Sequence, residues 1–524
     1  MQWREKKSLR PHDFACLTRR AFMQGGAVAL SSLAAQSTAI PASLPGAQKL
    51  PRWRGFNLPD RMHLDNSRFH EEDFDIISQW GFDFVRLPLD YRIWSSADEA
   101  KNDAELESLT QVVGLGNSRG LHVNLCLHRA PGYSVQGAID SLNLWGEGDN
   151  GEQARARFYE QWRLLASRFK SFSSKELSFN LVNEPKAMPR EKYLAVVKAA
   201  VSGIRAIDPS RLVIVDGCGD VKSAWMAALP ELSLLNVAES LHVYFPDRLT
   251  QYKSSWYSSH EDFAAPTWPT RNVLNGFLCG PGKSEYHAPL EIYTNFDSEI
   301  KLSIEIELVN ASVILAISAD GEILDKHTIP CKSSDSEVRH FGPADAGWNQ
   351  CLNETTVSIR IPAGAKKISL EVIGGDWMTF TKLVFETARR SGPQAIVLPV
   401  SSTQWTRNPV FHLSANGDLV PENGPRRLDE KAELEALVPW RELRARGVGV
   451  HVGEFGVNNQ TPHKVTLAWM RDQLDILKRS GFGWALWELR GPWGVLDSER
   501  SDVRYEDHRE HKLDRDMLQL LLAS

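Results

Sequence analysis

The sequence predicts an α/β fold: a (β/α)8 TIM barrel with a β-sandwich domain inserted between its sixth and seventh strands. Short apolar segments alternate with amphipathic ones at the spacing of strand and crossover-helix units. Eight such units can be counted, which is the number that closes a TIM barrel. Between residues 275 and 391 the pattern changes to short alternating strands separated by turns, which is typical of a β-sandwich. A doubly wound sheet is the alternative, but eight units with carboxylates at strand ends favour a closed barrel.

The predicted elements place six barrel strands before the insert and two after it. The strands are expected at 53–58, 82–87, 121–127, 177–183, 211–216, 237–243, 447–453 and 481–486. The helices are expected at 69–80, 104–118, 152–170, 190–207, near 224–228, and at 429–446, 463–479 and 512–522. Within the insert, strands are expected at 301–308, 311–318, 356–361, 367–373 and 379–385. The barrel therefore comprises residues 49–274 and 392–524, and the insert, similar to a carbohydrate-binding module, comprises residues 275–391.

Composition and charge narrow the classes of partner. The chain has 524 residues, 42% of them hydrophobic and 24% charged, as in ordinary globular proteins. The formal net charge of −6 gives no basic surface, which argues against nucleic acid as a partner. We expect a monomer.

Residues 1–48 have the features of an export signal rather than of a folded segment. A charged region containing Arg19 and Arg20 is followed by a run of apolar and small residues and then by a Ser/Ala/Pro-rich stretch. Paired arginines followed closely by Phe22 resemble a bacterial twin-arginine signal. The apolar run is too short for a membrane span. We therefore expect a periplasmic or extracellular protein.

The cysteines and glycines give no sign of a metal or a cofactor. No Cys-x-x-Cys or Cys/His spacing typical of a metal site is present, and no glycine-rich loop of the phosphate-binding kind. Cys126 lies in an apolar strand and is best interpreted as a small buried hydrophobe. Cys331 and Cys351 could pair within the insert. We expect neither metal nor organic cofactor.

Two glutamates end two different predicted strands. Glu184 follows the fourth strand in the run Leu177–Pro185, and Glu454 ends the seventh in VGVHVGEFG. In a TIM barrel the carboxyl ends of the strands line one common pocket. Hydrolysis of a glycosidic bond needs two carboxyl groups, one to protonate the leaving oxygen and one to attack or stabilise the sugar carbon. Other strand ends carry further polar or aromatic residues: Asn57, Arg86, His128, Asn183, His242, Tyr244 and Trp487.

These motifs resemble glycoside hydrolase family 5. The matching residues are Arg86 in VRLP, His128 in LCLHR, Asn183 and Glu184 in LVNEP, His242 and Tyr244 in LHVYFP, Glu454 in GEFG and Trp487 in ALWELRG. The resemblance covers about 49–274 and 392–524 but not the insert. It implies a retaining β-glycosidase with Glu184 as acid/base and Glu454 as nucleophile, and a proton donor whose pKa is raised by the second carboxylate.

The resemblance also implies roles for the supporting residues. Arg86 would keep Glu454 ionised, Tyr244 would hydrogen-bond the same carboxylate, and Asn183 would bind the sugar 2-hydroxyl. His128 and His242 would bind hydroxyls or position the acid, and Trp487 would stack beneath the sugar ring.

The substrate is less well defined by the sequence. Tryptophans on several loops are candidate sugar platforms: Trp94, Trp145, Trp256, Trp268, Trp487 and Trp493. Several platforms favour an endo-acting enzyme on a β-1,4-glucan such as cellulose. The alternatives are a β-mannanase, an exo-acting β-1,3-glucanase or β-glucosidase and, more remotely, a non-catalytic glycan-binding protein.

Overall fold

The computed structural model describes residues 47–524, with gaps. Residues 66, 96–101, 187, 220–225, 255–264, 285, 311, 332–349, 390–391, 402–406, 415 and 425–426 lie outside the description, as do the side chains of 350–354, 387–394 and 401. The predicted export signal and Trp256 therefore lie outside the described residues. Within the described part of the chain, no helix combines the length and the apolar character needed to cross a membrane.

Eight parallel strands form a closed barrel, as the sequence predicts. They are β1 (Arg54–Asn57), β2 (Phe84–Asp90), β3 (His122–Ala130), β5 (Leu177–Asn180), β6 (Leu212–Asp216), β9 (Ala238–Val243), β25 (Val450–Phe455) and β26 (Gly483–Leu486). The sheet order β2-β1-β26-β25-β9-β6-β5-β3 closes through pairing of β2 with β3. Because all eight strands are parallel, their carboxyl ends lie at one rim of the barrel.

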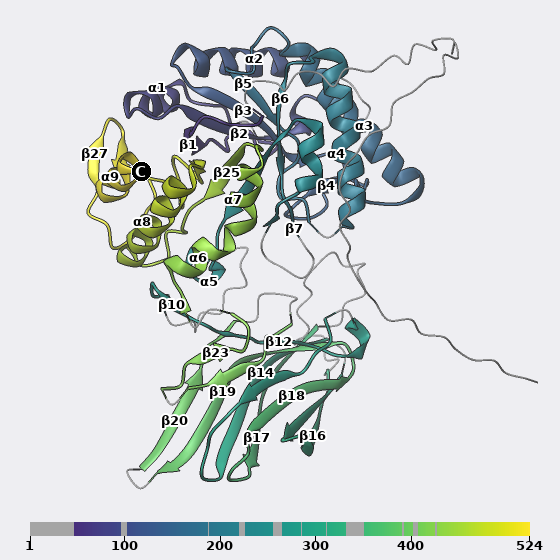
Figure 1. Ribbon diagram of the computed structural model, residues 1–524, viewed down its shortest axis with the longest axis vertical. Helices are drawn as coiled ribbons and strands as arrows, with labels where there is room; N and C mark the ends of the chain where they lie inside the picture. Colours follow the sequence, from purple (N-terminus) through teal and green to yellow (C-terminus); the bar gives the residue numbers. More distant parts are fainter. Residues whose placement is uncertain are drawn as a thin grey trace, which may run out of the picture. The chain divides into compact units, whose positions relative to one another are not determined.

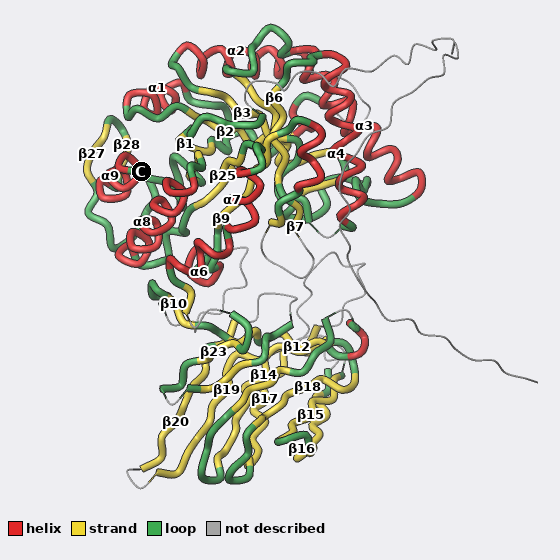
Figure 2. Tube along the Cα trace, in the orientation of Figure 1, coloured by secondary structure: helices red, strands yellow, loops and turns green. Residues whose placement is uncertain are grey.

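Helices surround the barrel strands (Figures 1 and 2). They are α1 (Glu71–Gln79), α2 (Asp103–Ser118), α3 (Gly148–Arg168), α4 (Arg190–Ile207), α5 (Asp247–Thr250), α6 (Glu430–Ala436), α7 (Val438–Ala445), α8 (His463–Ser480) and α9 (Arg515–Ala523). Their inner faces and the outward side chains of the strands form one large apolar core. Asn102, Asp429 and Asp514 cap the amino ends of α2, α6 and α9 with side-chain hydrogen bonds.

Two predicted helices differ from those observed. The helix expected at 429–446 is divided into α6 and α7, because Pro439 in the first turn of α7 has no N–H to continue the earlier helix. Near 224–228, the described residues Met226–Ala227 form strand β8, which pairs with β7 (Cys218–Gly219). Pro230 then begins a short 3-10 helix, Pro230–Leu235. Pairing with β7 outweighs the local helical preference there.

The segment between β9 and β25 contains two further sheets. One has the order β12-β19-β14-β17, with β20 paired to β19, and the other has the order β16-β15-β18-β13-β22-β23. Their strands are β12 (Phe277–Cys279), β13 (Leu290–Tyr293), β14 (Ile300–Asn310), β15 (Val313–Ala319), β16 (Glu322–Ile329), β17 (Gln350–Ile361), β18 (Lys367–Gly374), β19 (Trp377–Arg389), β20 (Gly392–Leu398), β22 (Phe411–Leu413) and β23 (Leu419–Pro421). Buried side chains from both sheets form a second apolar core. The insert is thus a sandwich, as predicted.

The sandwich sheets continue beyond residue 391, the end expected from the sequence. β20 pairs with β19, and β22 pairs with β13. The chain leaves and returns through a two-stranded ribbon in which β10 (Thr270–Arg271) pairs antiparallel with β24 (Arg427–Leu428). Cys331 is disulfide-bonded, whereas Cys126, Cys218 and Cys279 are buried thiols.

Candidate active site

The two glutamates predicted to carry the chemistry meet at the carboxyl rim of the barrel. Glu184 follows β5 and Glu454 lies near the end of β25. One carboxylate oxygen of each lies within 4.8 Å of the other and of a ring nitrogen of His242. The side chain of Glu454 is 5% exposed, whereas the side chain of Glu184 is 27% exposed. Solvent and substrate therefore have freer access to Glu184 than to Glu454.

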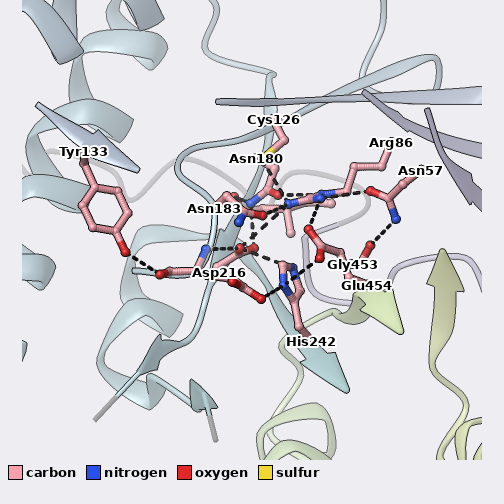
Figure 3. A network of polar contacts seen from close by, with 12 residues as sticks. Asn57, Arg86, Cys126, Tyr133, Asn180, Asn183, Asp216, His242, Gly453 and Glu454 are labelled. Carbon is pink, nitrogen blue, oxygen red and sulfur yellow. Dashed lines mark hydrogen bonds and ion pairs between the residues drawn. The ribbon is translucent and has the colours of Figure 1, made fainter. Parts of the chain in front are cut away.

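Both oxygens of Glu454 accept hydrogen bonds from the predicted partners. Arg86 donates from Nη1 to Oε1 at 2.7 Å, and the hydroxyl of Tyr244 donates to Oε2 at 2.9 Å. Figure 3 shows the Arg86 side chain pointing towards Glu454. A guanidinium and a phenol on opposite oxygens fix the orientation of this carboxylate.

Arg86 is itself held in a buried polar network. It is 1% exposed and donates to Asn57 Oδ1 at 3.0 Å, to Asn180 Oδ1 at 3.1 Å and to Asn183 Oδ1 at 2.7 Å. Its Nη2 also lies 3.0 Å from Cys126 Sγ. Cys126 is buried as expected, and its sulfur accepts a hydrogen bond in addition. The planar guanidinium thus donates hydrogen bonds to four neighbours in addition to Glu454.

Glu184 has a different environment, dominated by His242. Nδ1 of His242 lies 2.8 Å from Oε1 of Glu184, and the same nitrogen lies 3.5 Å from Oε2 of Glu454. On the other side of the ring, Nε2 lies 3.5 Å from Oδ2 of Asp216. A single imidazole is therefore surrounded by three carboxylates.

This arrangement moves the pKa values of the two glutamates in opposite directions. Burial raises the pKa of Glu184, but the hydrogen bond and the charge of His242 outweigh burial and bring this pKa well below its ordinary value. Burial raises the pKa of Glu454, against the lowering effects of the His242 and Arg86 charges. The pKa of His242 is raised: burial lowers it, but the charges of Glu454 and Asp216 prevail.

The structure thus differs from the expectation that Glu184 itself has the raised pKa. The physical reason is the position of His242. Its ring competes for the proton that closeness to a second carboxylate would otherwise place on Glu184. The opposed pKa directions of Glu184 and His242 favour a proton on the imidazole, at the other end of a 2.8 Å hydrogen bond to Glu184.

The remaining predicted residues lie beside the same network. His128 is buried, its ring centroid lies 5.8 Å from that of Trp487 at an interplanar angle of 30°, and burial lowers its pKa to about 3. Among the described residues, the buried Nδ2 of Asn183 has no hydrogen-bond partner. A buried donor without a partner is rare and indicates a place for a ligand acceptor. All the predicted site residues are thus brought together: Asn57, Arg86, His128, Asn183, Glu184, His242, Tyr244, Glu454 and Trp487.

Sequence reasoning missed three residues that hold this site. Asn180 and Asp216 lie at the ends of β5 and β6, and Tyr133 begins the short strand β4 (Tyr133–Ser134). Asn180 donates to Asp216 Oδ1 at 2.8 Å, and Tyr133 donates to the backbone carbonyl of Glu184 at 2.6 Å. Asp216 could have been found, because it is the last residue of the fifth predicted strand. Tyr133 lies beyond a strand end, where spacing carries no such signal.

The predicted aromatic platforms are only partly available. Trp94 and Trp493 are each 2% exposed, so they pack in the protein and offer no ring to a sugar. Trp145, Trp268 and Trp487 are partly exposed, but the indole of Trp268 donates to Asp472 Oδ2 at 2.8 Å. Burial of two platforms weakens the argument for many subsites.

Glu184, His242 and Glu454 also have the donor types and the spacing of a metal site. Two features oppose a cation there. The guanidinium of Arg86 is 2.7 Å from Glu454 Oε1, and each of the three groups already takes part in a hydrogen bond, His242 with Glu184 and Glu454 with Arg86 and Tyr244. The absence of a metal or an organic cofactor remains a prediction.

Comparisons with known proteins agree with this fold and this site. Residues 45–276 match the family model described as cellulase (glycosyl hydrolase family 5). Endoglucanase C of Acetivibrio thermocellus is 29% identical over 192 residues, which cover 36% of this chain and 54% of that protein. Cellodextrinase A of Ruminococcus flavefaciens is 26% identical over 204 residues, which cover 37% of this chain and 57% of that protein. The chain thus spans about half the length of the curated relatives it matches.

A solved structure has a similar fold over most of the chain. A crystal structure of a glycoside hydrolase superposes with a TM-score of 0.56 at 24% identity, covering 90% of this chain and 99% of that one. The match to the family model covers the first six barrel strands and Glu184. The predicted resemblance to glycoside hydrolase family 5 is confirmed.

Proposed function

We propose that this protein is a retaining endo-β-glycosidase that hydrolyses β-1,4-glucan by double displacement. The observation that carries the proposal is the separation of the two glutamates, whose nearest oxygens lie within 4.8 Å. Retaining glycosidases place their carboxyl groups roughly 5–5.5 Å apart, whereas inverting enzymes need about 6.5–9.5 Å to admit a water molecule. The choice of a β-1,4-glucan rests on the family match and on the names of the relatives.

In the first step, Glu454 attacks the anomeric carbon while the glycosidic oxygen receives a proton from Glu184. The bond between the anomeric carbon and that oxygen breaks, the leaving chain departs as an alcohol, and a glycosyl ester of Glu454 remains. Arg86 and Tyr244 hold Glu454 so that one oxygen faces the sugar. As the ester forms, Glu454 loses its negative charge and Arg86 keeps its other acceptors, so the guanidinium stays in place.

The proton reaches Glu184 from His242. In the free protein the opposed pKa directions of Glu184 and His242 favour a proton on the ring, and among the described carboxylates Glu184 is the one hydrogen-bonded to Nδ1. A bound sugar excludes water from the rim, which disfavours the charged pair of carboxylate and imidazolium and favours neutral His242 with protonated Glu184. The proton therefore moves along an existing hydrogen bond.

In the second step, water attacks the anomeric carbon of the glycosyl ester and gives its proton to Glu184. The ester bond to Glu454 breaks, and the sugar leaves with its original anomeric configuration. Asn183 offers its partnerless Nδ2 to a hydroxyl of the sugar, and Trp487, stacked near His128, offers a ring face.

The decisive experiment follows the anomer formed from cellotetraose by proton NMR during hydrolysis. The initial product should be the β-anomer, and an initial α-anomer would overturn the retaining mechanism. A panel of carboxymethyl-cellulose, mixed-linkage β-glucan, glucomannan and laminarin tests the substrate, with Glu454→Gln as the blank. Mixed oligosaccharides from β-1,4-glucans support the proposal. Release of monosaccharide alone, or action confined to laminarin or glucomannan, would replace the substrate by one of the alternatives.

We also infer that the protein is exported. This inference rests on the sequence of residues 1–48 alone. Fractionation of a bacterial host should place the wild-type protein outside the cytoplasm and retain an Arg19→Lys, Arg20→Lys variant inside it. Equal export of both proteins would argue against the twin-arginine route.

A further inference from the structure

Glu184 has a backbone conformation that its sequence disfavours. Its φ is +45°, in the left-handed region, which costs a residue other than glycine roughly 1 kcal/mol or more. The following residue is Pro185, and a residue before proline prefers extended backbone. The conformation therefore has to be held by contacts from elsewhere in the fold.

Two side chains from other parts of the barrel hold the peptide groups on either side of this residue. The hydroxyl of Tyr133 donates to the carbonyl oxygen of Glu184 at 2.6 Å and accepts the N–H of Lys186 at 3.1 Å. Oδ2 of Asp216 accepts the N–H of Glu184 at 3.0 Å. Figure 3 shows Tyr133 and Asp216 as parts of one network of polar contacts. We refer to Tyr133 and Asp216 as the backbone clamp.

Both members of the clamp are fixed in turn. Tyr133 is 8% exposed, and its ring packs edge-on against Trp145 with centroids 5.3 Å apart. Asp216 is fully buried and accepts a hydrogen bond from Asn180, whose Oδ1 accepts one from Arg86. Arg86 contacts Glu454, so the clamp links the backbone of one glutamate to the side chain of the other.

We propose that Tyr133 and Asp216 are positioning residues that aim the carboxyl group of Glu184 at the leaving oxygen of the substrate. The left-handed turn directs the side chain towards His242 and Glu454. Without the clamp, Glu184 would relax towards extended backbone and its carboxyl group would move off this line. This inference rests on the proposed function, because it concerns the proton donor of that reaction.

The test separates proton donation from every other part of the reaction. Cellotetraose has a poor leaving group that needs a proton, whereas 2,4-dinitrophenyl β-cellobioside has a leaving group that departs without one. In Tyr133→Phe, which keeps the packed ring and loses the hydroxyl, kcat for cellotetraose should fall about 10- to 100-fold, since small misplacements of a catalytic group cost rate on this scale. Formation of the glycosyl ester from the aryl cellobioside should stay within about twofold of wild type.

A matched control removes another tyrosine hydroxyl that hydrogen-bonds to the backbone of a turn. Tyr505 accepts the N–H of Arg500 at 2.6 Å and pairs with Ser498, beside two residues with positive φ, Asp497 and Glu499. Tyr505→Phe should not distinguish the two substrates. Asp216→Asn alters the other half of the clamp and should show the same preference for the aryl glycoside when each protein is assayed at its own pH optimum, which separates the clamp from the effect of the Asp216 charge on His242. This variant provides the test if Tyr133→Phe is poorly folded.

Selective loss on cellotetraose in Tyr133→Phe or Asp216→Asn, with native circular dichroism, supports the clamp. Equal loss on both substrates, or no loss on either, overturns it while leaving the proposed function intact. Failure of wild-type protein to hydrolyse either substrate would overturn the proposed function and this inference with it.

Discussion

Asp216 and His242 face each other in the interior of the barrel, with Oδ2 of Asp216 3.5 Å from Nε2 of His242. Both side chains are buried. The charge of Asp216 is among the causes that raise the pKa of His242 against the effect of burial. The negative charge of Asp216 therefore favours a proton on the ring that lies beside Glu184.

Replacing Asp216 by asparagine should shift the alkaline limb of the pH–rate profile to lower pH. Loss of the negative charge removes one cause that raises the pKa of His242, so the shared proton is lost at lower pH. The measurement is kcat/KM on cellotetraose from pH 4 to 9. Asp75→Asn, which removes a half-exposed carboxylate paired with Arg119 on the barrel surface, is the control and should leave the limb unchanged. A shift to higher pH would contradict the role assigned to Asp216.

The variants Glu184→Gln and Glu454→Gln should lose activity in different ways. Both Glu184→Gln and Glu454→Gln should lower turnover of cellotetraose by roughly a thousandfold or more. With the dinitrophenyl cellobioside, Glu184→Gln should give a burst of phenolate followed by slow release, because ester formation needs no acid whereas hydrolysis of the ester needs a base. Glu454→Gln should give no burst. A burst in Glu454→Gln would show that the roles of acid/base and nucleophile are the reverse of those assigned. Near-full activity in either variant would show that its glutamate is not catalytic.

Arg86→Lys should be costly despite the retained charge. A lysine ammonium cannot reach Asn57, Asn180, Asn183 and Glu454 together, so buried acceptors lose their donors. We expect a loss of about 3–5 kcal/mol in the free energy of unfolding, measured by urea denaturation. Arg119→Lys, on a solvent-accessible pair, should change stability by less than about 1 kcal/mol. Similar small effects at both positions would show that the Arg86 network is not fixed in the way its contacts indicate.

Glu239→Gln should make the protein more stable above neutral pH. Burial raises the pKa of Glu239 to about 7, so the folded state holds a proton that the unfolded state releases near pH 4.5. The free energy of unfolding therefore falls as pH rises from about 4.5 to 7, because the folded state binds more protons over this range. Glutamine keeps an acceptor for the N–H of Leu229 without this titration. At pH 8 the variant should gain about 2–3 kcal/mol relative to its difference from wild type at pH 4, by thermal denaturation at both values.

The sandwich should be removable without loss of the barrel. Thr270 and Arg271 pair with Leu428 and Arg427, so deleting 272–426 and joining the ends through Asn-Gly gives a two-residue hairpin of a favoured type. The hydrogen bonds around Glu184 and Glu454 come from barrel elements, and activity on soluble oligosaccharides should stay within a few-fold of wild type. Comparing soluble with insoluble glucan then assigns the insert: selective loss on insoluble glucan indicates glycan binding, and equal activity on both indicates a structural role. A truncated protein that does not fold would contradict the prediction.

The sequence predicted the barrel and most of the site because both rest on strand ends. Apolar segments of the right length fix the strands, and parallel strands bring Arg86, Glu184 and Glu454 to one rim whatever the details of the loops. What the sequence could not predict depends on contacts between loops. The position of Tyr133 beneath Glu184, the burial of Trp94 and Trp493, and the continuation of the sandwich past residue 391 are set by tertiary packing. The directions of the pKa shifts of Glu184, Glu454 and His242 likewise depend on the position of His242 between three carboxylates, which only the folded structure shows.

The ribbon of β10 and β24 has a consequence for how this chain folds. Strands β9 and β25 are neighbours in the barrel although roughly 200 residues separate them in sequence. A folded sandwich brings Arg271 and Arg427 together, so the effective loop between β9 and β25 shortens from roughly 200 residues to roughly 50. The entropic cost of closing that loop is then lower by about 1 kcal/mol. Early folding of the insert would therefore shorten the effective loop between β9 and β25 and speed assembly of the barrel.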